Sequence, residues 1–236
     1  MRLPRMATTV LPRPWDSTFF GARIFEAHLS DDRVDDVVNE AAAAAAECLY
    51  LFVDAGELAA IETAVRSGAR LVDLRVELGG RIDQDAAAAA TQTRAATRAD
   101  RDILMPQAPE LAVESRFARD RRIPEERVRE MYEIWLDRCL DEGVVAVPVG
   151  SGLGFVGARK DGDIARIELV YVDVASRGRG LGRALIREAV SGLAASDVTV
   201  VTQIGNVAAQ RLYQSLGLRS RRTLTVLHLW LDERNL

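Results

Sequence analysis

A stretch of glycine and arginine residues at positions 176–183 has the composition of an anion-binding loop. It follows an apolar segment, opens a helix predicted over 181–195, and reads Ser176-Arg177-Gly178-Arg179-Gly180-Leu181-Gly182-Arg183. Glycine lets the backbone turn tightly so that successive N–H groups face one point, and the N-terminus of a helix adds partial positive charge there. The three arginines bring mobile positive charge. We therefore expect the loop to bind phosphate, with a plain turn as the alternative.

The spacing of these glycines argues against two common nucleotide sites. A dinucleotide fingerprint needs G-x-G-x-x-G and an acidic residue about 20 positions further on. Here the glycines lie at 178, 180 and 182, and the next predicted strand, 198–203, ends in Thr202-Gln203. A Walker loop needs a lysine at its end, and the chain's single lysine, Lys160, lies upstream. Nicotinamide and ATP sites are both disfavoured.

A second pattern begins where a helix is predicted over 207–216. It reads Asn206-Val207-Ala208-Ala209-Gln210-Arg211-Leu212-Tyr213 and continues to Leu216-Gly217. Taken alone, Asn206 is explained as a helix cap and Tyr213 as a core aromatic residue. A tyrosine hydroxyl is also neutral at pH 7 and is able to donate a proton in catalysis. The structural and the catalytic interpretations both stand at this point.

Together the two patterns resemble the GNAT superfamily of acyl-CoA-dependent N-acyltransferases. The family motif Q/R-x-x-G-x-G/A is met by Arg177, Gly180 and Gly182, and the motif N-x-x-A-x-x-x-Y-x-x-x-G by Asn206, Ala209, Tyr213 and Gly217. Residues 168–173 are similar to the central strand of that family. The resemblance covers roughly residues 101–231. It implies an α/β GNAT fold with a mixed, mostly antiparallel central sheet flanked by helices.

The resemblance also implies an activity and a role for each site residue. The protein would transfer an acetyl group from acetyl-CoA to the primary amine of a small molecule, by direct attack in a ternary complex. Pantetheine would enter where two strands, 164–174 and 198–203, part. The cofactor-binding residues would be Val172, through its N–H, and Arg177, Gly178, Arg179, Gly180, Leu181, Gly182, Arg183 and Asn206. Tyr213 would protonate the departing thiolate, and Glu168 would take a proton from the amine, directly or through water.

Two further segments resemble those of the TDP-fucosamine acetyltransferase-like proteins within that family. They are Pro14-Trp15-Asp16-Ser17-Thr18-Phe19-Phe20-Gly21, an arm in which we expect Asp16 to be exposed, and the run from Ser115 through Asp120 to Pro124. Those enzymes acetylate a nucleotide-linked amino sugar, which is therefore the preferred acceptor. Another small amine, such as an antibiotic or a biosynthetic intermediate, is one alternative. A catalytically silent acyl-CoA-binding module is another, and the presence of Tyr213 argues against it.

Composition and charge disfavour several other classes. The 236 residues carry a net charge of −4, which argues against a nucleic-acid partner. No apolar run reaches the roughly 18 residues of a membrane span, and no apolar leader is evident, so we expect a cytoplasmic location. Isolated His28 and His228 and the predicted buried thiols Cys48 and Cys139 indicate no metal site. The sequence leaves a homodimer open.

Periodic patterns place these residues on the elements of two domains. The N-terminal α/β domain, 1–95, is predicted to hold strands at 24–29, 49–53 and 70–78, a helix through 41–46 and a helix over 57–67. Polar, alanine-rich residues 82–100 indicate a linker or an exposed helix. The GNAT domain would be 96–236. Its further predicted elements are a strand at 102–105, a helix from Pro124, strands at 144–147 and 152–159, and a final strand at 224–231.

Overall fold

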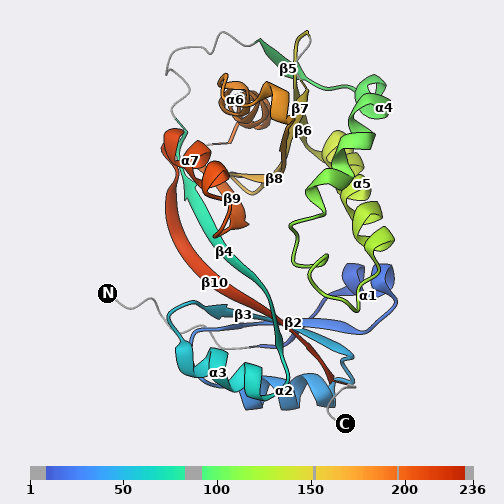
Figure 1. Ribbon diagram of the computed structural model, residues 1–236, viewed down its shortest axis with the longest axis vertical. Helices are drawn as coiled ribbons and strands as arrows, with labels where there is room; N and C mark the ends of the chain where they lie inside the picture. The colour runs from blue at the N-terminus through green and yellow to red at the C-terminus, as the bar shows by residue number, and fades with distance from the viewer. Residues whose placement is uncertain (1–8, 83–91, 151–152, 196, 232–236) are drawn as a thin grey trace. The chain divides into compact units, whose positions relative to one another are not determined.

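The computed structural model describes residues 9–82, 92–150, 153–195 and 197–231 (Figure 1). Contacts divide the chain into two compact units. Unit 1 contains the chain up to Arg75, the segment Arg119–Ile123 and the chain from Arg222 onward; unit 2 contains Val76–Ala118 and Pro124–Arg221. This division differs from the predicted domains 1–95 and 96–236, because β4 (Arg70–Gly80) and β10 (Arg219–Trp230) each run from one unit into the other.

Unit 1 is a sheet with two helices packed on one face. Its strands follow the order β1 (Leu11–Pro12), β2 (Ile24–Leu29), β3 (Cys48–Asp54) and the second part of β10. Only β2 and β3 are parallel. The helices α2 (Val34–Ala43) and α3 (Leu58–Arg66) lie side by side and share one apolar core with this sheet (Figure 1). The predicted strands and helices of this region are confirmed apart from their ends.

The predicted N-terminal arm is instead a short helix, α1 (Pro14–Phe20). Pro14 favours the first helical turn, and Gly21 ends the helix with a φ of 71°. The expectation that Asp16 is exposed was wrong, since only 2% of this residue is accessible. Its carboxylate accepts a 2.6 Å hydrogen bond from Arg13 Nε. Asp16 is therefore a buried, ion-paired residue of unit 1.

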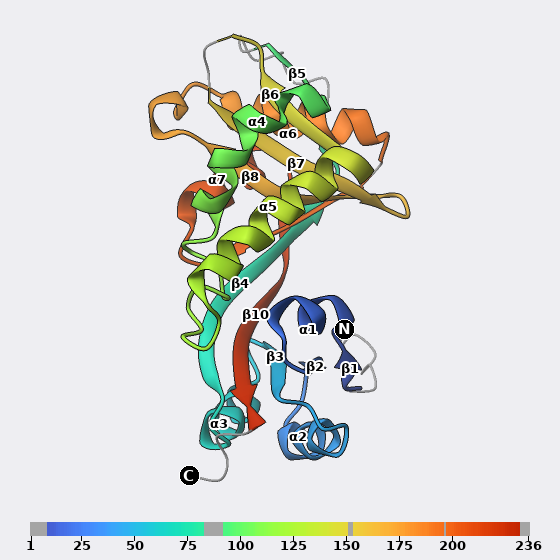
Figure 2. The same ribbon diagram turned by 90° about the vertical axis from the view of Figure 1, so that its right-hand side faces the viewer.

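Unit 2 contains a mixed, mostly antiparallel sheet with helices on both faces. Its strands follow the order β9 (Asp197–Gln203), β8 (Ile164–Val172), β7 (Gly154–Asp161), β6 (Val144–Pro148) and β5 (Thr93–Ala95). Only the β8–β9 pair among these is parallel. One face packs on α6 (Leu181–Leu193) and α7 (Val207–Ser215); the other packs on α5 (Glu125–Glu142) and on the 3-10 helix η2 (Met105–Leu111) (Figure 2). This arrangement confirms the predicted GNAT fold.

The strand predicted at 102–105 was wrong, because this segment is helical. A 3-10 turn, η1 (Arg98–Asp100), leads into α4 (Arg101–Leu104) and then into η2. Thr97 and Asp100 form a capping box, in which each side chain bonds the backbone of the other residue and starts the helix. Residues 83–91 of the predicted linker lie outside the described residues. The described part from Gln92 to Asp100 contains β5 and η1.

Both cysteines, Cys48 and Cys139, are buried and unbridged, as predicted. Among the described residues, no helix combines the length and the apolar character that crossing a membrane requires.

Candidate active site

The strands β8 and β9 pair along only part of their length. They are joined in parallel from Ile164 opposite Asp197 to Ile167 opposite Val200, and no pairing beyond that point is seen between these two described strands. β8 nevertheless continues to Val172, where it still pairs with β7. From residue 168 to 172, the edge of β8 on the side of β9 is therefore not hydrogen-bonded to β9.

This free edge presents main-chain polar groups of β8. The N–H of Asp173 donates to the Leu153 carbonyl at 3.1 Å, which places it on the side of β7. Because neighbouring residues of a strand present their polar groups to opposite edges, the N–H and C=O of Val172 lie on the side of β9. Arg177 Nε donates to the Val172 carbonyl over 2.9 Å. The edge is thus able to bind an extended ligand chain much as it would bind a further strand.

The loop after β8 leads directly into the N-terminus of α6. The 3-10 turn η3 (Val174–Ser176) comes first and is capped by Asp173, whose Oδ1 accepts from the Ala175 N–H at 2.9 Å. Gly178 and Gly180 then adopt φ values of 76° and 82°, a left-handed backbone that side chains rarely allow. Gly180 is the N-cap of α6, and no side chain caps the helix there. The N–H groups of the first turn thus face outward, as a phosphate site requires.

The remaining loop residues add charge and close packing. Arg177, Arg179 and Arg183 are exposed around the uncapped helix end. Leu181 is buried and anchors the first turn of α6 in the core. A Cβ atom added to Gly182 would lie 3.0 Å from Leu212 Cδ2, so glycine permits the close approach of α6 and α7. The geometry therefore suits a doubly charged group such as a pyrophosphate.

Two predicted site residues lie on α7. Asn206 is the N-cap of this helix, and its Oδ1 accepts from the Ala209 N–H at 3.0 Å, which leaves the amide nitrogen of this exposed residue as a donor. Tyr213 is 3% exposed and packs in the core beneath α6. Burial raises the pKa of Tyr213 above its ordinary value. The hydroxyl therefore stays protonated at neutral pH, as a proton donor must.

Glu168 lies at a β-bulge on the other side of β8. Ile167 is opposite Ala158 and Leu169 is opposite Gly157, so Glu168 is one extra residue between two paired positions. Its carboxylate faces α5 and β7, where it contacts Arg138 and Arg159 at 3.3 Å and 3.1 Å. Val172 and Tyr213, by contrast, pack in the core on the α6 side. The structure therefore brings the loop, Val172 and α7 together and turns the Glu168 side chain to the opposite face.

Sequence reasoning missed the two arginines that contact Glu168. Arg138 immediately precedes the predicted buried Cys139 on α5, and Arg159 ends the apolar run of β7. Both looked like ordinary surface residues, because a bulge leaves no reliable sequence signal. The periodicity of α5 could only have shown that Arg138 lies next to its buried face.

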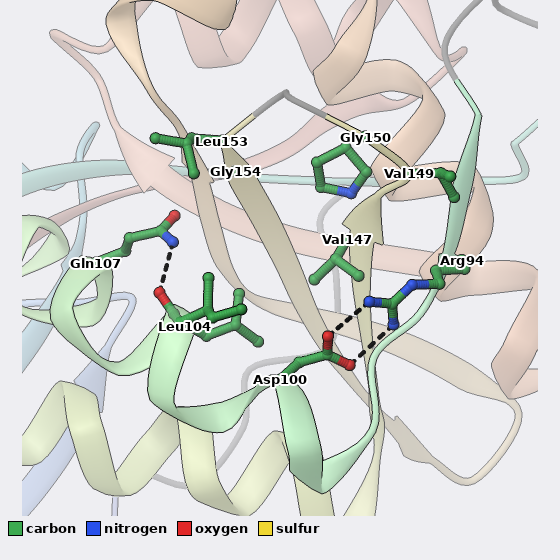
Figure 3. A pocket seen from close by; sticks show the side chains of 11 residues that line it. Arg94, Asp100, Leu104, Gln107, Val147, Val149, Gly150, Leu153 and Gly154 are labelled. Carbon is green, nitrogen blue, oxygen red and sulfur yellow. Dashed lines mark hydrogen bonds and ion pairs between the residues drawn. The ribbon is translucent and has the colours of Figure 1, made fainter.

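A separate cavity of about 230 Å³ lies beside β5, β6 and β7. Figure 3 shows Arg94 and Asp100 joined by two hydrogen bonds at one side, at 2.9 and 2.6 Å. At the other side, Gln107 Nε2 donates to the Ile103 carbonyl at 2.9 Å. Hydrogen bonds from Arg94 hold the pKa of Asp100 well below its usual range. Neither the loop residues 177–183 nor any residue of β9 lines this cavity. No metal-binding group of three or more His, Cys, Asp or Glu residues occurs in the described part of the chain.

This chain is similar in sequence and fold to known proteins. Residues 103–218 match the family model described as "Acetyltransferase (GNAT) family". A comparison with curated proteins found no match.

Several solved structures share the fold. A GCN5-related N-acetyltransferase from Sphaerobacter thermophilus is 18% identical, with 94% of this chain and 75% of that chain covered and a TM-score of 0.57. A functionally unknown conserved protein from Staphylococcus epidermidis is 12% identical, with coverages of 92% and 88% and a TM-score of 0.62. A GCN5-related N-acetyltransferase from Kribbella flavida is 14% identical, with coverages of 87% and 80% and a TM-score of 0.56.

Proposed function

We propose that this chain, whose residues 103–218 match the acetyltransferase (GNAT) family, is an acetyl-CoA-dependent N-acetyltransferase. Its acceptor is a small-molecule primary amine, preferably on a nucleotide-activated amino sugar. The observation that carries the acetyl-CoA part of the proposal is the free edge of β8 beside an uncapped helix. Pairing with β9 stops at Ile167, and the loop that follows β8 opens α6 without a side-chain cap. An extended chain that ends in a pyrophosphate matches both features.

In this proposal the loop and the free edge hold acetyl-CoA, which supplies the acetyl thioester. The N–H groups from Gly178 to Gly182 bind the pyrophosphate, and Arg177, Arg179 and Arg183 balance its charge. The N–H of Val172 binds the acyl oxygen and stabilises the negative charge that grows on it during attack. The amide nitrogen of Asn206 donates to the pantetheine arm. Each role needs only groups that the described structure leaves available.

Two side chains move protons in the proposed reaction. Tyr213 donates its hydroxyl proton to the departing thiolate, which its raised pKa permits because the hydroxyl is neutral at working pH. Glu168 accepts a proton from the attacking amine through water, since its carboxylate lies on the α5 face of the bulge. The amine must lose one proton for the amide to form, and the departing thiolate gains one. The base therefore acts on the acceptor and the acid acts on CoA.

The acceptor class rests on two segments of sequence. Residues 14–21 and 115–124 are similar to those of enzymes that acetylate nucleotide-linked amino sugars. The same chemistry on an antibiotic or a biosynthetic amine is the rival within the enzyme class. A silent acyl-CoA-binding module is the rival outside it.

A thiol-release assay with acetyl-CoA distinguishes these three. We expect release with nucleotide-linked 4-amino sugars and little with aminoglycosides or polyamines. Release only with the latter amines would replace the acceptor and keep the chemistry. CoA binding without release for any acceptor would favour the silent module, and binding is measured separately by the rise in melting temperature.

A further inference from the structure

The bulge in β8 turns the Glu168 carboxylate toward α5, which packs directly against β7 at Gly157. Ile167 packs in the core on the α6 side and Leu169 in the core on the α5 side, and Glu168 shares the α5 face with Leu169. A Cβ atom added to Gly157 of β7 would lie 3.1 Å from Cys139 Sγ. Glycine at this position lets α5 approach the sheet. The approach brings Arg138 and Cys139 to the carboxylate.

Three donors from two elements surround this carboxylate. Arg159 Nε donates to Oε1 at 3.1 Å, and Arg138 Nη2 lies 3.4 and 3.3 Å from Oε1 and Oε2. The Cys139 thiol is 3.7 Å from Oε2. Burial, together with the charge of Glu168, raises the pKa of Cys139 to about 12, so the thiol keeps its proton and remains a donor. The Glu168 side chain is only 12% exposed.

The two arginines differ in what else they bind. Arg159 divides its guanidinium between Glu168 and Glu142, whose carboxylate lies 2.8 Å from Arg159 Nη1. Arg138 Nε is buried and has no hydrogen-bond partner in the described structure. A buried donor without a partner costs stability. The contact of Arg138 with Glu168 is made by Nη2, and the side chain keeps this position although its Nε stays without a partner in the described structure.

Resting on the proposed function, we propose that Arg138 and Arg159 are positioning residues that hold the Glu168 carboxylate in the orientation needed to accept the amine's proton. Glu168 is the extra residue of the bulge and has no residue of β7 directly opposite it. Two guanidinium groups on different elements hold the Glu168 carboxylate from two directions and balance its charge in this largely buried position. Neither arginine touches the substrate in this scheme, because each acts through Glu168.

The test compares turnover of single and double variants with the acceptor found in the thiol-release assay. Arg159→Gln and Arg138→Gln should each lower kcat, by up to about 10²-fold for a misplaced catalytic group, with KM for acetyl-CoA unchanged. Arg159→Lys, which keeps the charge, should recover part of the loss. In a Glu168→Gln background, which has lost the base, Arg159→Gln should cost nothing further.

Arg166→Gln is the matched control. Arg166 lies on β8 two residues before Glu168, and its ion pair with Asp161, at 3.0 Å, is exposed. Its removal should leave kcat unchanged. Wild-type kcat in Arg138→Gln and Arg159→Gln would overturn the proposal, and so would losses that multiply in the Glu168→Gln background.

A second readout does not need an acceptor. The carbon-13 signal of the Glu168 carboxyl, assigned by its disappearance in Glu168→Gln, should move in Arg138→Gln and Arg159→Gln and stay in place in Arg166→Gln. An unmoved signal would overturn the positioning role even if the enzyme turns over. A moved signal without turnover for any amine would support the contact and count against the proposed acceptor chemistry instead.

Discussion

Gly182 of α6 faces Leu212 of α7 so closely that an added Cβ atom would lie 3.0 Å from Leu212 Cδ2. The same Cβ would lie 3.8 Å from Val172 Cγ2 on β8. The end of β8, the first turn of α6 and the middle of α7 therefore meet at one glycine. Because Tyr213 follows Leu212 directly, the packing that orients the phosphate loop also orients the proposed proton donor.

Replacing Gly182 with valine should remove CoA binding. The branched side chain would push the first turn of α6 away from α7 and so misplace the loop N–H groups. Overpacking of this kind typically costs about 1–3 kcal/mol of stability. Gly192→Val is the matched control, because Gly192 lies on the same helix but far from the loop, and a Cβ there would lie 3.1 Å from Val144 Cγ2 of β6. Both variants should melt lower, and only Gly182→Val should lose the CoA-induced rise in melting temperature. An equal CoA response in both would place the phosphate elsewhere.

The exposed arginines of the loop should make CoA binding sensitive to salt. Arg179→Gln and Arg183→Gln should each weaken binding, and each should reduce the dependence of affinity on ionic strength because exposed charge pairs are screened. Isothermal titration at low and high salt measures both effects. Arg166→Gln again serves as the control. Affinity that is independent of salt in the wild type would show that the loop N–H groups act without the arginines.

Sequence patterns predicted the elements around the phosphate loop because their signals are local. Glycine positions, an apolar strand and the 3.6-residue periodicity of α6 all lie within a few residues of one another. The segment at 102–105 failed because its short apolar run fits a strand as well as a helix. The Thr97 and Asp100 capping box was the local signal that would have corrected it.

Contacts between distant residues could not be predicted in this way. Asp120 was noticed only within a run of family-like sequence, and His228 only as an isolated residue in a strand. In unit 1 they are hydrogen-bonded at 2.7 Å, although 108 positions separate them. The Glu168 bulge was hidden for a related reason, since the extra residue appears only against the register of β7.

The Asp120–His228 pair should be important for stability and lose that importance in acid. Burial opposes the charge, yet hydrogen bonds from His228 and Trp230 lower the pKa of Asp120 below its ordinary value. A carboxyl group whose pKa is lowered in the folded state stabilises the fold at pH values above its unfolded pKa of about 3.9. This stabilisation is lost as the pH falls through the folded pKa. Asp120→Asn should cost about 1–3 kcal/mol at pH 7, because the buried His228 and Trp230 donors lose their charged acceptor. Urea unfolding should show this cost shrinking below about pH 4; a cost independent of pH would contradict the assignment.

Replacing Tyr213 with phenylalanine should separate catalysis from packing. The ring keeps its place in the core, so stability at pH 7 and CoA affinity should change little, whereas loss of a general acid typically lowers turnover about 10²–10⁴-fold.

Alkaline unfolding gives an independent check of the buried hydroxyl of Tyr213. Because burial raises the pKa of Tyr213, the protonated hydroxyl stabilises the fold below the unfolded value of about 10, and that contribution is lost as pH rises further. The wild type should therefore lose more stability than Tyr213→Phe above about pH 10. Full turnover in the variant, measured where chemistry limits the rate, would make Tyr213 a packing residue and require another proton donor.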